Sequence, residues 1–210
     1  MRTTAEELDA WDQRMLAWAK TISANDPRHE GFKNFYESRI LSGEMISADE
    51  RHVFAVVAEK YPEAGQFVMA EACAGLGTLT AALVLAGHLV RAIECDIGRA
   101  GLARCLRRHL GYSYPVRCTT WQDYALERMN LLVPLDVLIF TNCVSSRCDE
   151  DGDAKIIDYL VAHGTDVIIR PDLYGGRAGM TFGSKTESVG NGYLWLNGAG
   201  RVDDAEKLQR

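Results

Sequence analysis

The chain of 210 residues lacks several features that mark membrane, secreted and zinc-binding proteins. No apolar run approaches the roughly 20 residues that cross a bilayer, and the polar, acidic start MRTTAEELDA differs from a secretory signal. None of the six cysteines forms a C-x-x-C pair, and no histidine lies at zinc-ligand spacing from one. We therefore expect a cytoplasmic protein whose cysteines are mostly small, reduced core residues.

The chain also lacks an excess of positive charge. Its 23 lysines and arginines are fewer than its 29 aspartates and glutamates, which gives a formal net charge of -6. A nucleic-acid-binding surface needs cations that neutralise phosphates, so nucleic acid is a disfavoured partner. Four arginines gather in one amphipathic segment, which we interpret as a solvated helix face: Arg99, Arg104, Arg107 and Arg108.

Residues 1–62 are predicted to form an N-terminal helical lid or extension. Capping boxes begin two of its segments, at Thr4 to Glu7 and at Ser47 to Glu50. We interpret one apolar stripe near its start as core packing, with a homodimer face as the alternative. The stripe alternates at steps of three and four residues, as one face of a helix does: Leu8, Trp11, Met15, Trp18 and Ile22.

From Phe67 the pattern changes to short apolar runs that alternate with helical segments. The runs are FVMAEA, LVRAIE, PVRCTT, LDVLIF and DVIIR. This rhythm predicts an α/β fold with a parallel sheet covered by helices on both faces. Two more strands are expected at Met180–Glu187 and Gly192–Leu196, joined by a turn at VGNG. The α/β domain is then residues 63–200, and residues 201–210 form a polar tail.

The best-marked loop contains Gly75 and Gly77, between a predicted strand and a predicted helix. Glycine lets a backbone turn sharply and approach a ligand, and the following helix N-terminus suits an anionic group. Glu94 follows Gly75 by nineteen residues, at the end of the next strand, where a carboxylate can accept both hydroxyl protons of a ribose. This spacing predicts a nucleoside-binding site. Thr80 stands where a nicotinamide-binding loop has its third glycine, which disfavours that cofactor.

This stretch resembles motif I of the class I S-adenosylmethionine-dependent methyltransferases, E/D-x-G-x-G-x-G. Here it reads Glu71-Ala-Cys73-Ala-Gly75-Leu-Gly77, with Cys73 in place of the first glycine. The resemblance implies a Rossmann-like, mostly parallel sheet with an antiparallel C-terminal strand, and S-adenosylmethionine as cofactor. It also implies an acid on the ribose, the segment TTWQDYAL along the adenine and LIFTNCVSS at the sulfonium. The implied cofactor-binding residues are Glu71, Cys73, Gly75, Gly77, Glu94, Cys95, Trp121, Gln122, Asp123 and Asn142.

Three residues are candidates for catalysis: Asn142, Tyr174 and Tyr36. An asparagine amide can fix an amino group, and a tyrosine phenol can hydrogen-bond a substrate or approach a sulfonium. The alternative for Tyr174 is a packed loop residue, and Tyr36 is a candidate for the lid over the cofactor. The N-P-P-[YF] motif of amino-directed enzymes is absent, which disfavours a DNA base as acceptor. No acid follows the fourth strand, so no catalytic metal is implied.

Four functions fit these observations. The first is a small-molecule methyltransferase. The second keeps S-adenosylmethionine but uses its aminocarboxypropyl arm, which releases methylthioadenosine instead of S-adenosylhomocysteine. The third is a non-catalytic binding protein that retains the fold, and the fourth is an RNA-modifying methyltransferase, whose sign would be a basic stripe beside the cofactor cleft.

Overall fold

The computed structural model describes residues 5–25, 30–131, 134–141, 150–170 and 185–198. Within these residues seven strands form one sheet in the order β3-β2-β1-β4-β5-β7-β6. The strands are β1 (Val68–Ala72), β2 (Leu89–Glu94), β3 (Val116–Cys118), β4 (Val137–Phe140), β5 (Asp166–Ile169), β6 (Lys185–Gly190) and β7 (Tyr193–Asn197). The first five strands pair in parallel, and β7 runs antiparallel between β5 and β6. The predicted sheet is thereby confirmed.

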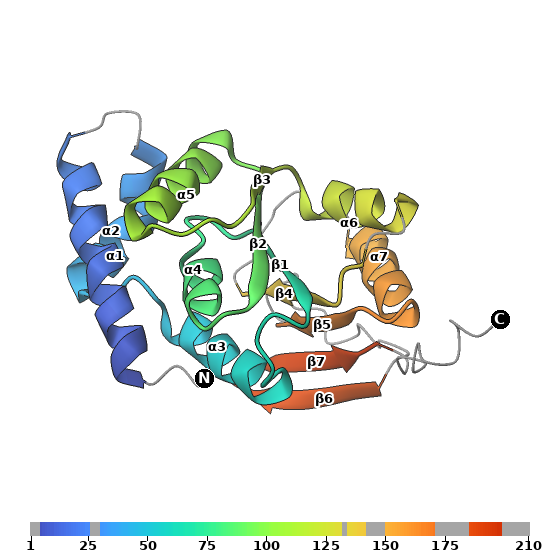
Figure 1. The fold of residues 1–210 in the computed structure, drawn as a ribbon. Coiled ribbons are helices and arrows are strands. Elements are labelled where there is room, and N and C mark those ends of the chain that lie inside the picture. Colours follow the sequence, from blue (N-terminus) through green and yellow to red (C-terminus); the bar gives the residue numbers. More distant parts are fainter. Residues whose placement is uncertain (1–4, 26–29, 132–133, 142–149, 171–184, 199–210) are drawn as a thin grey trace.

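Helices cover both faces of the sheet (Figure 1). The helices α4 (Thr78–Leu85) and α5 (Ile97–Leu110) lie on one face, and α6 (Trp121–Asn130) and α7 (Glu150–Ala162) lie on the other. Each face has its own apolar core. All four residues of β4 are buried, as expected for a central strand that has helices above and below it.

The helical extension consists of α1 (Ala5–Asn25), α2 (Glu30–Ser42) and α3 (Ala48–Lys60). It packs against the α4–α5 layer and shares its core. The stripe on α1 faces inward: Met15 is completely buried, and the Trp11 ring lies 5.0 Å from the ring of Tyr112. The structure therefore agrees with core packing. The division of the chain at residue 62 remains a prediction.

Local signals explain where several helices begin and end. The capping box of α3 is present in both directions between Ser47 and Glu50. Asp96 caps α5, and Gly111, with a φ of 77°, ends it. The arginines of α5 are only partly a solvated face, because Arg104 and Arg107 donate to the carbonyls of Val116 and Tyr114.

The C-terminal hairpin lies slightly later in the chain than predicted. Strand β6 begins at Lys185 among the described residues, and the expected start at Met180 lies outside them. The turn between β6 and β7 has positive φ angles at Gly190, Asn191 and Gly192, which suits the glycine-rich sequence there. The predicted tail also lies outside the described residues. In the part of the chain that can be described, no helix has the length and apolarity needed to span a membrane.

Replacing Met15 by alanine tests whether the α1 stripe is core. We expect the free energy of unfolding to fall by about 2–5 kcal/mol, because a buried side chain is removed. Urea denaturation measures this change, with Leu41→Ala as the control. Leu41 is 81% exposed on α2, so its loss should cost less than about 0.5 kcal/mol. A change of sedimentation coefficient without a change of stability would favour the homodimer face instead.

Candidate functional site

The glycine loop, residues 73–77, joins β1 to α4 at the carboxyl end of the sheet. Cys73, Gly75 and Gly77 have positive φ angles of 53°, 57° and 71°. The Ala74 N–H donates to Ile93 O on the neighbouring strand β2, and the Gly77 N–H donates back to Ala74 O. The loop is therefore a tight, hydrogen-bonded turn that approaches β2 closely.

Glu94 closes this turn from the end of β2. Its side chain is 3% exposed. One carboxylate oxygen accepts the Gly75 N–H at 2.8 Å, and the other accepts the Asp96 N–H at 2.8 Å. A carboxylate oxygen has two lone pairs, so each oxygen can accept one more donor, such as a ribose hydroxyl.

Glu71 faces the first turn of α4. It is 1% exposed, and its Oε2 accepts from Thr80 N at 2.9 Å and from Thr80 Oγ1 at 2.5 Å. Thr141 Oγ1 donates to the other oxygen at 3.4 Å. Burial raises the pKa of Glu71 to about 8, and the nearby charge of Glu50 acts in the same direction. Near neutral pH, Glu71 therefore carries a proton.

The N-terminus of α4 retains free donors. Gly77 is its N-cap and supplies no side-chain acceptor. The N–H groups of Thr78 and Leu79 have no acceptor among the described residues. Such N–H groups, together with the helix dipole, favour an anionic group.

Tyr36 reaches this loop from the helical extension. Its hydroxyl accepts the Leu76 N–H at 3.0 Å, and burial raises its pKa to about 12, so the phenol is neutral. A Cβ atom built on Gly75 would clash with this hydroxyl. Gly75 is therefore needed for its backbone conformation and for the close approach of Tyr36.

The segment expected along an adenine follows β3, and its side chains also serve local structure. Trp121 is 3% exposed and packs edge-on against Phe140, and its buried Nε1 has no partner among the described residues. Gln122 donates to Asp153 on α7 at 2.8 Å. Asp123 is exposed and accepts from Thr120 Oγ1 at 2.7 Å. Their contact with a cofactor remains a prediction.

The cysteines that the structure describes are in two chemical states. Cys95, Cys105 and Cys118 are free, whereas Cys73 is disulfide-bonded. The expectation of a reduced thiol is therefore wrong for Cys73. No C-x-x-C pair in the sequence indicates this bond.

The structure brings Glu71, Glu94, Tyr36 and the glycines together, and Cys95 follows Glu94 directly. Asn142 and Tyr174 lie outside the described residues. Sequence reasoning gave Glu50 only a capping role, whereas its other oxygen accepts from Thr78 Oγ1 at 2.7 Å. The described residues contain no group of three or more histidine, cysteine or acidic residues arranged to hold a metal ion.

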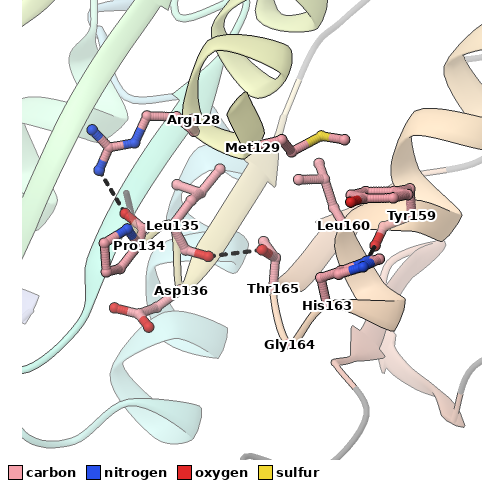
Figure 2. Close-up of a pocket in the computed structure, with 10 residues that line it drawn as sticks. All are labelled: Arg128, Met129, Pro134, Leu135, Asp136, Tyr159, Leu160, His163, Gly164 and Thr165. Carbon is pink, nitrogen blue, oxygen red and sulfur yellow. Dashed lines mark hydrogen bonds between the residues drawn. The ribbon is translucent and has the colours of Figure 1, made fainter. Parts of the chain in front are cut away.

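A cavity of about 330 Å³ lies away from the glycine loop, between α6 and α7 (Figure 2). Leu135 and Asp136 line it just before β4, and Thr165 lines it just before β5. It therefore opens at the amino ends of these strands, whereas the glycine loop and Glu94 follow the carboxyl ends of β1 and β2. This cavity is separate from the candidate site.

The strand order and the antiparallel β7 give the chain the fold of the class I S-adenosylmethionine-dependent methyltransferases. One similar solved structure is a mutant of MtNAS in complex with S-adenosylmethionine. It is 15% identical, with a TM-score of 0.55, and the match covers 90% of this chain and 74% of that one. Neither protein-family models nor curated proteins gave a match.

Two further structures are similar to this chain. The sugar N-methyltransferase KedS8 from Streptoalloteichus is 23% identical, with a TM-score of 0.49, and the match covers 67% of this chain and 53% of that one. Magnesium protoporphyrin IX methyltransferase from Synechocystis, with bound SAH, is 14% identical, with a TM-score of 0.49 and coverages of 74% and 70%. The chain thus spans about half the length of KedS8.

Glu71→Gln should change how stability depends on pH. A carboxyl whose pKa rises from 4.5 to about 8 on folding contributes most stability below pH 4.5 and loses that contribution as the pH rises to about 8. Glutamine imitates the protonated form at every pH. Its advantage over the native residue should therefore grow by on the order of 2 kcal/mol between pH 5 and pH 8.5.

Urea denaturation at several pH values measures this effect. Glu59→Gln, at an exposed position on α3, is the matched control and should follow the wild-type pH dependence. Parallel pH curves for Glu71→Gln and wild type would show that Glu71 is ionised throughout the range.

Proposed function

We propose that this chain is an S-adenosylmethionine-dependent transferase that transfers a methyl group to a small-molecule acceptor. One observation carries the proposal: Glu94 lies against the glycine loop, 2.8 Å from the Gly75 N–H, at the carboxyl edge of a sheet with this strand order. Ligands of open α/β sheets bind at that edge. S-adenosylmethionine supplies a methyl carbon already activated by its sulfonium.

The residues at this edge suit the parts of that cofactor. Glu94 retains acceptor capacity for the ribose hydroxyls, and the free N–H groups of Thr78 and Leu79 suit its carboxylate. Trp121 has a buried indole N–H without a partner among the described residues, and we propose that it lies on the adenine side of the site. Cys95, Gln122 and Asp123 complete the proposed adenine side, while Glu71, Cys73 and Gly77 shape the loop.

The acceptor side of the proposal rests on fewer observations. Tyr36 contacts the loop directly through Leu76, so it can close over a bound cofactor as part of the lid. Asn142 and Tyr174 are proposed to orient the acceptor, on the strength of their places after the fourth and fifth strands. A small acceptor is favoured over nucleic acid because the net charge is -6.

Product analysis tests the reaction. The protein is incubated with S-adenosylmethionine, alone and with a panel of small amines, phenols and thiols, and the products are identified by mass spectrometry. S-adenosylhomocysteine formed with an acceptor supports methyl transfer. Methylthioadenosine would show that the aminocarboxypropyl arm reacts instead, and tight binding without turnover across the panel would favour a binding protein.

Glu94→Ala tests the cofactor site. We expect affinity for S-adenosylhomocysteine, measured by calorimetry, to fall on the order of 10- to 100-fold, because hydrogen bonds to a charged group are lost. Glu127→Ala is the control, since that carboxylate is exposed on α6 and pairs with Arg117. Affinity unchanged by Glu94→Ala would contradict the assignment of this site.

A further inference from the structure

The carboxylate of Glu50 makes contacts beyond its own helix. It is 4% exposed at the start of α3. Its Oε2 accepts the Ser47 N–H at 2.6 Å, which completes the capping box, and accepts from Arg39 on α2 at 2.8 Å. These contacts satisfy the capping role with one oxygen. The second oxygen, Oε1, can therefore accept a hydrogen bond from outside the capping box.

That second oxygen, Oε1, holds the first residue of α4. Thr78 Oγ1 donates to it at 2.7 Å, and Thr78 is 1% exposed. Thr78 directly follows Gly77, the last residue of the glycine loop, and lies 28 residues from Glu50. The contact thus joins the helical extension to the turn that forms the candidate cofactor site.

Helix α4 depends on such outside contacts. Its N-cap is Gly77, which has no side chain, and no acidic residue occurs in its first turn. The side chains that fix this turn come from elsewhere: Glu50 holds Thr78, and Glu71 holds Thr80 through both its N–H and its hydroxyl. Without Glu50, Thr78 loses the one side-chain hydrogen bond that it makes to the described residues.

We propose that Glu50 is a positioning residue of the cofactor site, which holds Thr78 and thereby fixes the N–H groups at the start of α4. The inference rests on the proposed function for its effect on cofactor affinity. It assigns the helical extension a second role besides covering the core, because α2 and α3 reach the glycine loop through Arg39, Glu50 and Thr78. Tyr36 adds a parallel contact at Leu76.

Three variants separate this role from capping. Thr78→Val removes only the hydroxyl that contacts Oε1 and leaves the contacts of Oε2 with Ser47 and Arg39 in place. Glu50→Ala removes both sets of contacts. Glu50→Gln is the conservative variant, because its amide can still hydrogen-bond the Thr78 hydroxyl, which is both a donor and an acceptor.

Asp12→Asn is the matched control. Asp12 is a carboxylate of the same extension, 1% exposed. It accepts the N–H groups of Met45 and Ile46 at 2.8 and 2.6 Å and a hydrogen bond from Arg51 at 3.2 Å. None of these residues belongs to the glycine loop or α4. Its substitution therefore weakens the extension without touching Thr78.

The measurements are affinity for S-adenosylhomocysteine by calorimetry, thermal midpoint, and amide hydrogen exchange at Thr80 and Ala81. We expect Thr78→Val and Glu50→Ala to bind about tenfold more weakly or worse, since a charge-assisted hydrogen bond is lost. Glu50→Gln should restore most of the affinity. Asp12→Asn should lower the thermal midpoint yet keep affinity within about twofold of wild type.

Wild-type affinity in Thr78→Val, or an equal loss in Asp12→Asn, would overturn the inference. If the wild-type protein does not bind S-adenosylhomocysteine, the proposed function fails, and hydrogen exchange still tests the positioning role. Faster exchange at Thr80 and Ala81 in Thr78→Val, but not in Asp12→Asn, supports it. Equal exchange in both variants contradicts it.

Discussion

The hydrogen bond from the Gly75 N–H to Glu94 is the contact on which the candidate site depends. It joins the glycine loop to the last residue of β2, nineteen residues further along the chain. The two can meet because β1 and β2 are parallel neighbours, with Ala72 opposite Ile93, so that both strands end at the same edge of the sheet. The acid and the glycine loop are therefore placed by strand pairing before any ligand is bound.

Two buried acids, Glu50 and Glu71, hold the first turn of α4, the helix that follows the glycine loop. Helix α4 has eight residues, none of them acidic, yet Glu71 and Glu50 approach its first turn from a strand and from another helix. Negative charge near a helix N-terminus is favourable, but two buried carboxylates repel each other. The raised pKa of Glu71 resolves this conflict, because one of the two groups stays protonated near neutral pH while Arg39 compensates the other.

Periodicity predicted the sheet well, since buried parallel strands such as β4 are continuous apolar runs. The sequence also predicted that Glu71 and Glu94 lie near the glycine loop, because Glu71 stands shortly before Gly75 and Glu94 stands at the end of the next strand. The contact of Glu50 with Thr78 could not be predicted, since its local pattern is already explained by capping. Gln122 and Asp123 show the same limit: sequence places them near a ligand edge, while the fold also uses them to hold α6 and α7.

The close approach of Tyr36 to Gly75 couples two positions that lie far apart in the sequence. A side chain at position 75 needs space that the Tyr36 hydroxyl fills, so substitutions at the two positions are not independent. A larger side chain at position 75 therefore requires the Tyr36 side chain to move, and it also puts a non-glycine residue into a strained, left-handed backbone conformation. Gly75 belongs to a motif typical of ligand-binding loops, but in this chain its small size also makes room for Tyr36 on α2.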